Sequence, residues 1–563
     1  MNDIEIRNAS ICDGTGEEPF HGSVGIRDGV ITEIGCVESG AKQVIDAGGL
    51  TLSPGFIDPH THYDAQMSWD PLCSPSSEHG VTTLLMGNCG VGLAPVRQDL
   101  KSREVLAWHL VNIESISIDL VLHGVNWVWE DFGQYMKAML SNGLALNPIF
   151  LVPHMALRLY VLGEEALERP ATPAESERMC GLLRDAMKAG AAGFSINRFA
   201  GHQGYQGRTN ASMLANREEI LSLARVMREF PGGILEANTS FTAKGFVQED
   251  IDLFAEISAL AGRPVILPGG LWFPGYPDDW ADRQMAQVNG AARKGGRIVS
   301  QISTRPFLIY QDFRQPMVWA ELPCFAERVI NQPVDVQLAA YRDPVFRQRF
   351  RDEQKTHGVL FQGQWDLVTI SGVDKPDNQK LMGMNIAELA KARNKGPVDV
   401  ILDLALDEGG TLAYTHAFIN SNPREIERLL DTPGIQIGQS DAGAHIAQFC
   451  NAGYAGMFIN EWVNRRGKYT IGQAVARVTS EHADLFGLSR KGRIAVGKDA
   501  DLVLFDPKRI NASRAERVQD LPSGGYRFVE RAEGISHVVV NGQVTFRDGV
   551  HQGPLPGRIA TPG

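Results

Sequence analysis

The segment PGFIDPHTHY (54–63) places two histidines, His60 and His62, directly after an apolar run. A short apolar run with these neighbours predicts a buried strand. In a strand, residues two apart point to the same face, whereas on a helix they diverge by about 200°. The two imidazoles therefore converge where this strand ends. At the carboxyl end of a barrel strand that direction leads inward, where barrel active sites lie.

Seven more segments of the middle region read as short apolar strands, at 80–89, 147–154, 189–197, 232–240, 263–270, 296–303 and 434–441. Helical stretches separate them, and Thr172 and Glu175 predict a capping box at the start of one. Apolar strands that alternate with helices predict a parallel sheet covered on both faces. With the strand before His60 the number is eight, which predicts an α/β fold, a (β/α)₈ TIM-like barrel.

The two ends of the chain show a different sequence pattern, in which short predicted strands are separated by turn sequences such as RDG and NG. They predict one small composite β-sandwich domain built from residues 1–54 and 492–563. The barrel then spans 55–491. Within it, the segment of about 305–430 is too long for a barrel connection, and we expect a mainly helical, lid-like insertion.

Composition excludes several classes of protein. The 563 residues carry a formal net charge of −12, which argues against a nucleic-acid partner because phosphate binding needs a concentrated basic face. The sequence has no run of eighteen or more apolar residues, so no membrane-spanning helix is predicted. The first residues, MNDIEIRNAS, lack the features of a secretory signal. Seven thinly spread cysteines suit reduced thiols, so we expect a cytoplasmic protein.

Three more residues follow predicted strands. Cys89 lies in GNCGVG, where glycines on both sides leave room for a bulky group, although it can equally be a small buried side chain. Asp441 follows the last strand, as either a helix N-cap or a functional carboxylate. His154 follows the third strand and is compatible with a structural or a catalytic role. An imidazole pair with such neighbours suits zinc or another borderline divalent metal.

These stretches carry a family resemblance. PGFIDPHTHYDAQ, the aspartate after the eighth strand and the terminal RKGRIAVGKDADLVLFDP resemble the amidohydrolase superfamily of metal-dependent (β/α)₈ hydrolases with a composite β-sandwich. HGVTTLLMGNCGVGLAP, PHMALRLYVLG and GFSINRFAGH are similar to its N-acyl-D-amino-acid deacylase branch, in which the cysteine is a metal ligand. The resemblance covers nearly the whole chain, weakly in the 305–430 segment, and implies association into a homo-oligomer.

The resemblance implies that four residues bind Zn²⁺ or another divalent transition metal, as one or two ions: His60, His62, Cys89 and Asp441. The family also supplies one histidine each from strands five and six, and the expected strands here contain none. Glu236 or Asn238 can contribute an oxygen, and His202 can reach in from the loop after strand four. The missing histidines favour a single ion.

The site implies hydrolysis of a small-molecule amide. A zinc-type ion lowers the pKa of bound water toward about 7, and Asp441 can accept the water proton and deliver it to the leaving amine. His154 or His416 can stabilise the oxyanion, unless these histidines belong to the core. If the substrate carries a carboxylate, an arginine should bind it. The candidates, each of which can instead form a surface salt bridge, are Arg158, Arg198 and Arg208.

Three functions stay open. The first is hydrolysis of a linear amide, most simply an N-acyl amino acid of the D type, to carboxylate and free amine. The second is hydrolysis of a cyclic amide, a lactone or a xenobiotic amide by the same groups. The third is a metal-free relative that uses the fold for assembly. Two aromatic segments, 269–280 and 125–131, can wall an apolar acyl pocket or pack in the core.

Overall fold

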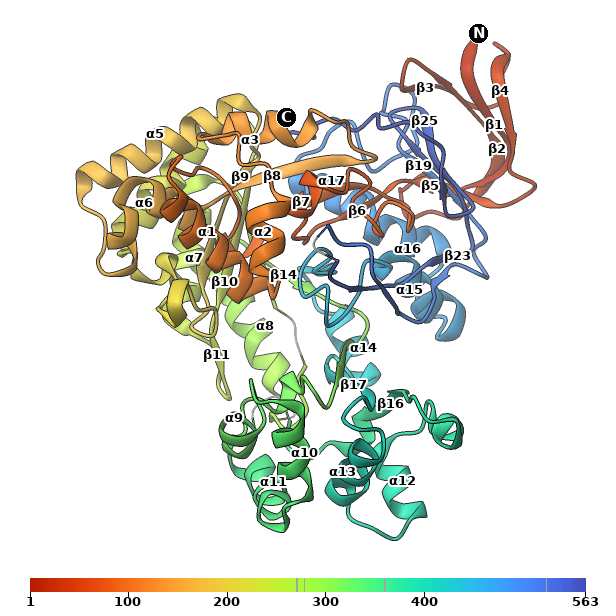
Figure 1. The fold of residues 1–563 in the computed structure, drawn as a ribbon. Helices are drawn as coiled ribbons and strands as arrows, with labels where there is room; N and C mark the ends of the chain where they lie inside the picture. Colours follow the sequence, from red (N-terminus) through yellow and green to blue (C-terminus); the bar gives the residue numbers. More distant parts are fainter. Residues whose placement is uncertain (270–271, 278, 359–360, 523) are drawn as a thin grey trace.

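A computed structural model of the chain describes residues 1–269, 272–277, 279–358, 361–522 and 524–563. Three regions share these residues: a barrel, a β-rich domain made from both ends of the chain, and an insertion that projects from the barrel (Figure 1). The barrel and the terminal strands lie side by side. The insertion hangs below both in that view.

Eight parallel strands form the barrel sheet, and each sequence-predicted strand segment overlaps one of them. In order along the sheet they are β6 (Phe56–Asp58), β7 (Val81–Met86), β8 (Asn147–Pro153), β9 (Gly193–Arg198), β10 (Ile234–Thr239), β13 (Val265–Pro268), β14 (Ile298–Ile302) and β18 (Ile435–Ile437). The last residue of the predicted segment 263–270 lies outside the described residues. These strands are almost wholly buried, as expected for a parallel sheet covered by helices. The predicted TIM-like barrel is confirmed.

The first and last strands meet just beyond their carboxyl ends. Thr61 and Ala442 form a parallel bridge. The amide of His62 donates to the carbonyl of Ala442 over 2.7 Å, and the amide of Asp441 donates to the carbonyl of His60 over 3.2 Å. The contacts that close the barrel thus run through the segments that carry the predicted ligands.

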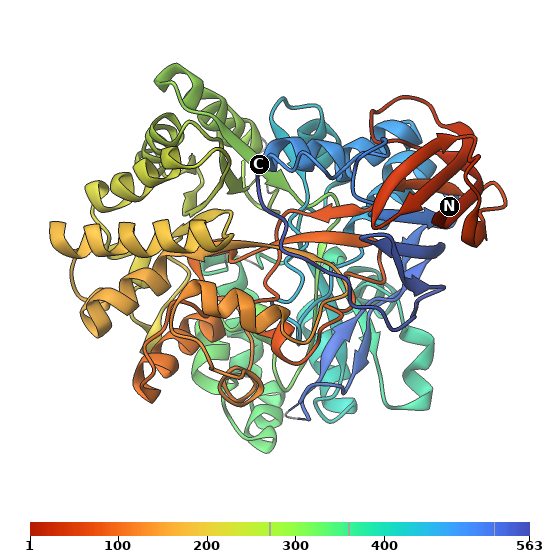
Figure 2. The ribbon, with the colours of Figure 1, turned by 90° about the horizontal axis from the view of Figure 1, so that it is seen from above.

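Helices surround the barrel sheet, as the view from above shows (Figure 2). They are α1 (Leu100–Glu114), α2 (Ile118–Gly124), α3 (Phe132–Leu140), α4 (His154–Leu162), α5 (Pro173–Ala189), α6 (Arg217–Val226), α7 (Gln248–Ala261), α8 (Trp280–Gly290), α14 (Pro423–Leu430), α15 (Tyr454–Ile459), α16 (Ile471–Val478) and α17 (Ser480–Phe486). The capping box predicted at Thr172 and Glu175 is present at the start of α5, which begins with Pro173. Gly190 ends this helix in the left-handed conformation.

Both ends of the chain contribute to a second, nine-stranded sheet. Its strands are β1 (Asn2–Ile11), β2 (Phe20–Arg27), β3 (Val30–Gly35), β4 (Ala41–Asp46), β5 (Thr51–Pro54), β19 (Leu502–Phe505), β24 (Ile535–Val540), β25 (Gln543–Arg547) and β26 (Val550–His551). β5 and β19 pair antiparallel and join the two ends. Side chains of these strands form a hydrophobic core of their own. The NG turn between β24 and β25 has positive φ at Asn541 and Gly542, as a tight hairpin requires.

The insertion contains a small sheet as well as helices. Its helices are α9 (Pro323–Arg328), α10 (Val334–Arg342), α11 (Pro344–Thr356), α12 (Ile386–Ala392) and α13 (Pro397–Asp407). They pack with an antiparallel sheet of β15 (Phe307–Asp312), β17 (Ala413–Ile419) and β16 (Val368–Gly372) around a separate core. The next helix, α14, buries Ile426, Leu429 and Leu430 in the barrel core. The insertion sheet therefore ends at Ile419, before the sequence-predicted limit of 430.

In the described ranges, no helix is both long enough and apolar enough to cross a membrane.

Candidate metal centre

Two buried histidines stand at the carboxyl end of β6. His60 and His62 are each 1% exposed, and their ring centres lie 5.2 Å apart. Thr61, between them, turns its hydroxyl away to donate to the carbonyl of Leu85. The extended backbone thus sends both imidazoles to the same side, as the spacing predicts.

Cys89 reaches these histidines from the turn after β7. The turn is tight, with positive φ at Gly87, Cys89 and Gly90. Sγ of Cys89 lies 3.6 Å from Nε2 of His60. One donor atom from each of His60, His62 and Cys89 lies within 4.8 Å of the other two, a grouping able to hold a metal ion.

Asp441 completes the set from the loop after β18. Its Oδ1 lies 3.3 Å from Nε2 of His60 and 3.9 Å from Nε2 of His62. Gly443 lets this loop approach closely, since a Cβ at that residue would lie 2.6 Å from the carbonyl oxygen of His62. The four predicted ligands therefore come together at one point.

Two of the donor spacings fit a tetrahedral divalent ion, whereas the 3.9 Å between His62 Nε2 and Asp441 Oδ1 is slightly longer than such an ion requires. Metal–ligand bonds of about 2.0–2.3 Å require donors roughly 3.3–3.8 Å apart. The distances from His60 Nε2 to Cys89 Sγ and to Asp441 Oδ1, 3.6 and 3.3 Å, lie in that range. Two imidazoles, a thiol and a carboxylate are also a donor set that suits zinc.

Two side chains that the sequence did not single out contact the outer nitrogens of the histidines. Oε1 of Gln301, on β14, lies 3.0 Å from Nδ1 of His60. Oε1 of Glu114, the last residue of α1, lies 3.3 Å from Nδ1 of His62. The acceptor at Nδ1 of His60 favours the tautomer whose Nε2 lone pair faces the centre, whereas His62 Nδ1 and Glu114 Oε1 are close without forming a hydrogen bond among the described residues. In the sequence, Glu114 stands out only as an acidic residue that follows mostly apolar positions of the helix; its burial is visible only in the structure.

Burial sets the protonation of the centre. It lowers the pKa of His60 to about 4 and that of His62 well below its ordinary value, so both imidazoles are neutral and can bind a metal at pH 7. Burial raises the pKa of Asp441 to about 7. Burial, with the carboxylates of Glu236, Glu114 and Asp441, also raises the pKa of the Cys89 thiol, which therefore needs a cation beside it to ionise.

The possible additional ligands lie near the centre but outside the three-residue group. Glu236, on β10, accepts from the amide of Cys89 through Oε2 over 2.9 Å. Its other oxygen is buried without a hydrogen-bond partner among the described residues. The side-chain nitrogen of Asn238 lies 3.7 Å from Sγ of Cys89. Nδ1 of His202 lies 2.8 Å from the side-chain nitrogen of Asn197. Where the family has histidines, strand five therefore presents a carboxyl and an amide.

His154 and Arg158, on α4, belong to a buried cluster with Glu219, an arrangement that matches the structural alternative left open for both residues. His154 places its ring nitrogens 2.6 Å from Ser212 Oγ and 3.1 Å from Glu219 Oε1. Arg158 donates to the Glu219 carboxylate and, over 2.7 Å, to the carbonyl of Arg169. Both side chains are fully buried, so these contacts leave them no access to a substrate.

The other two arginine candidates are also ion-paired. Arg208 pairs with Glu168 over 3.0 Å at the surface, which is the salt-bridge alternative given for it above. Arg198 ends β9, at the rim that bears the centre, and pairs with Asp250 over 3.0 Å. Its side chain is 22% exposed, whereas Arg158 is fully buried.

A small cluster of aromatic side chains contacts the loop that carries Asp441. Phe449 stacks on His445, four residues after Asp441, and contacts Phe307. Phe273 belongs to the same hydrophobic cluster and lies within the predicted aromatic segment 269–280, of which 270, 271 and 278 lie outside the described residues. The other predicted segment, 125–131, packs Trp127 and Trp129 into the barrel core.

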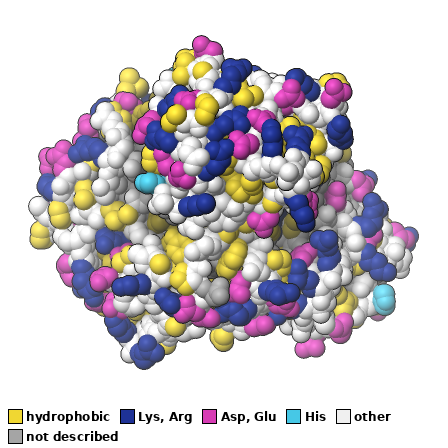
Figure 3. Space-filling view, turned by 90° about the horizontal axis from the view of Figure 1, so that it is seen from below, with side chains coloured by type: hydrophobic (Ala, Val, Ile, Leu, Met, Phe, Trp, Pro, Cys, Tyr) yellow, Lys and Arg dark blue, Asp and Glu magenta, His cyan; other side chains and the backbone are white. Residues whose placement is uncertain are grey.

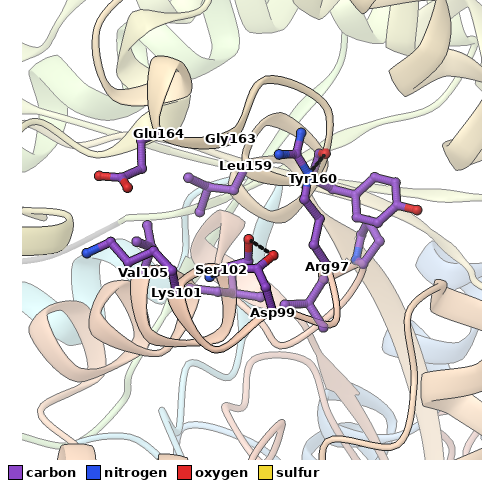
Figure 4. A pocket seen from close by; sticks show the side chains of 12 residues that line it. Arg97, Asp99, Lys101, Ser102, Val105, Leu159, Tyr160, Gly163 and Glu164 are labelled. Atoms are coloured by element: carbon purple, nitrogen blue, oxygen red, sulfur yellow. Dashed lines mark hydrogen bonds between the residues drawn. The ribbon is translucent and has the colours of Figure 1, made fainter.

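A separate small pocket of about 210 Å³ lies between the start of α1 and the end of α4 (Figure 4). Arg97 and Tyr160 stand on one side of it and Lys101 and Glu164 on the other. None of the four predicted ligands lines it, so it is distinct from the metal centre.

On the face of the molecule that Figure 3 shows, acidic and basic side chains are interspersed with hydrophobic ones.

The sequence profile of the amidohydrolase family matches residues 43–546. The chain belongs to this family. It is therefore a metal-dependent hydrolase that acts on carbon–nitrogen bonds other than peptide bonds.

Individual relatives match over the full length. An uncharacterised protein of Mycobacterium tuberculosis is 29% identical over 100% of this chain and 96% of its own. D-aminoacylase of Alcaligenes xylosoxydans xylosoxydans is 26% identical over 99% of this chain and 97% of its own. The solved structure of N-acyl-D-glutamate deacylase from Bordetella bronchiseptica, complexed with zinc and a phosphonate inhibitor, superposes with a TM-score of 0.65. It is 22% identical and covers 99% of each chain, and this likeness shows the fold.

Proposed function

We propose that this protein hydrolyses an N-acyl amino acid of the D type to a carboxylate and a free amine. The observation that carries the proposal is the convergence of two imidazoles, a thiol and a carboxylate at the carboxyl end of the barrel. The full-length similarity to D-aminoacylase supports the substrate class. A small-molecule amide is thus the expected partner.

His60, His62, Cys89 and Asp441 would hold the metal, and Zn²⁺ suits this donor set. When bound, such an ion lowers the pKa of water and polarises a carbonyl group. Asp441 is the proton carrier in this proposal. Its carboxylate accepts a proton from the attacking water and donates it to the departing amine, a role worth roughly 10²–10⁴-fold in rate.

Neighbouring residues would orient the reaction. Gln301 would hold His60 through its outer nitrogen, and the Glu114 carboxyl lies 3.3 Å from the outer nitrogen of His62. Phe307 and Phe449 supply apolar surface for an acyl group or an amino-acid side chain. Arg198 is the candidate for the substrate carboxylate, since a modest rotation away from Asp250 would free its guanidinium.

Amine release from a panel of acylated amino acids tests the proposal. The full chain is loaded with zinc and assayed on N-acetyl and longer N-acyl derivatives of D- and L-amino acids, with cyclic amides alongside. We expect release from the linear D derivatives and at least tenfold slower release from their L counterparts. Hydrolysis of cyclic amides alone, or a preference for L derivatives, would contradict the proposed substrate.

A further inference from the structure

A cavity of about 600 Å³, which we call the hairpin cavity, lies beside the metal centre. Among its lining residues are Ser115, Tyr310, Gln311, Gln448, Arg517 and Phe528. They come from the α1–α2 loop, from β15 of the insertion, from the loop after Asp441, and from the hairpin of β21 (Glu516–Val518) and β22 (Arg527–Val529). Backbone hydrogen bonds of 2.7 Å from Tyr310 to Gln448 and from Phe528 to Ile446 hold three of these segments together.

One wall of the hairpin cavity is aromatic. Tyr310 and Phe528 stack with ring centres 4.7 Å apart, and Tyr526 meets Phe528 edge-on at 6.1 Å. The guanidinium of Arg517 lies over the ring of Tyr526, 3.7 Å from its centre. This arrangement offers flat apolar surface with a cation at its border.

A buried donor without a partner also lines the cavity. Gln311 is 8% exposed, and its Oε1 accepts from the amide of Val318 over 3.0 Å. Its Nε2 has no hydrogen-bond partner among the described residues. Buried polar groups are nearly always hydrogen-bonded, so a donor left open beside a cavity indicates a ligand with an acceptor oxygen.

The charges of the cavity favour an anionic ligand. Arg517 has no carboxylate within ion-pair distance in the described part of the chain. Asp312 also lines the cavity, but its Oδ1 accepts from the amides of Arg314 and Gln315. Arg517 is therefore a cation without an ion-pair partner among the described residues, whereas the Asp312 carboxylate is already engaged by two backbone amides.

We infer that the hairpin cavity binds a small carboxylate that carries an aromatic ring. The ring of such a molecule packs against Tyr310, Tyr526 and Phe528, and its oxygens accept from Arg517 and Gln311. The volume suits a small organic molecule, since ligand pockets span about 300–1,000 Å³. None of the four metal-site residues lines this cavity, so the inferred site is separate from the proposed catalytic one.

Isothermal titration calorimetry with 3-phenylpropionate on the zinc-loaded full chain tests this inference, and it needs no turnover. We expect saturable binding that Arg517→Gln and Gln311→Leu each weaken at least about tenfold. Arg514→Gln removes an exposed arginine of the same segment that does not line the cavity, and should leave binding unchanged. The uncharged analogue 3-phenylpropanol should bind at least about tenfold more weakly.

Two outcomes would overturn the inference. One is the absence of saturable binding at millimolar probe. The other is binding that Arg517→Gln and Gln311→Leu leave unchanged while Asp441→Asn abolishes it, because such binding would belong to the metal centre. Thermal unfolding of each variant shows whether the fold is intact, and Arg517, being exposed, can be replaced without disturbing the core.

Discussion

Nε2 of His60 lies 3.3 Å from Oδ1 of Asp441, although the two residues follow the first and the last strand of the barrel. The segments that carry them are joined by backbone hydrogen bonds and by Ser440, whose hydroxyl donates to Asp58 over 2.7 Å. The closure of the barrel and the assembly of the metal centre are therefore one structural event. An ion held there would tie the two edges of the sheet together.

Metal removal should therefore lower the thermal stability of the whole protein. A ligand that binds only the folded state stabilises it by mass action, and we expect chelation to lower Tm by roughly 3–8 °C. Differential scanning calorimetry of chelated and zinc-reloaded protein measures the change. Equal Tm values in the two states would show that no ion bridges these strands.

Asp441→Asn should leave the fold intact and reduce turnover by roughly 10²–10⁴-fold, because an amide cannot carry the proton from water to the amine. Steady-state kinetics and circular dichroism check the two parts of this expectation. Asp431→Asn is the matched control, since that carboxylate is exposed and pairs with Lys468 at the surface. Turnover of the Asp441 variant at the level of the control would rule out the shuttle.

Cys89→Ser should weaken metal retention, because a serine hydroxyl is a far poorer zinc ligand than a thiolate. Elemental analysis after exhaustive dialysis should find the wild-type protein loaded and the variant depleted. The exposed Cys36 provides the control, and Cys36→Ser should keep the wild-type metal content. Full loading of the Cys89 variant would remove sulfur from the proposed ligand set.

The barrel could be predicted because its strands are short, apolar and buried on both faces, which makes each one visible as a continuous run. Cys89 and Asp441 were within reach for a related reason: each directly follows such a strand, and the carboxyl ends of parallel strands meet at one rim. The sheet within the insertion was missed, because β15 and β17 are far apart in the sequence and pair only across the intervening helices.

Contacts that helices contribute to the site residues could not be predicted from the sequence. Glu114 reaches His62 from the end of α1, and no local pattern relates that position to the end of β6. The surroundings of Arg158 could not be predicted either, because proximity to a strand end does not tell whether a side chain points to the rim or between helices. Its partner Glu219 lies on α6, and only the packing of α4 beside that helix brings the two together.

Arg158→Met should therefore act on stability. Glu219 is buried, which raises its pKa, yet its contacts with His154 and Arg158 hold that pKa at about 2. Removing the arginine takes away the guanidinium that pairs with this buried carboxylate, which costs about 3–5 kcal/mol. Denaturant unfolding should show this loss, whereas Arg208→Gln at the surface should cost less than about 1 kcal/mol. A raised KM without loss of stability in the Arg158 variant would instead restore its substrate-binding role.

Glu78 should give the protein a pH-dependent stability that its glutamine variant lacks. The side chain is 6% exposed, and burial raises its pKa from 4.5 to about 6 against the opposing effect of Arg531, 3.8 Å away. Between pH 4.5 and 6 the folded state thus binds more protons than the unfolded chain, so stability falls as the pH rises through this window.

The comparison with Glu78→Gln isolates this effect. Relative to the variant, the wild-type free energy of unfolding should decrease by about 2 kcal/mol from pH 4.5 to above pH 6, since each pKa unit is worth about 1.36 kcal/mol. Urea unfolding of both proteins across this range measures the difference. Glutamine does not titrate, so the variant lacks any pH dependence that comes from this side chain. If wild type and variant lose or gain stability equally across the range, Glu78 has the same pKa in the folded protein as in the unfolded chain, and the prediction is wrong.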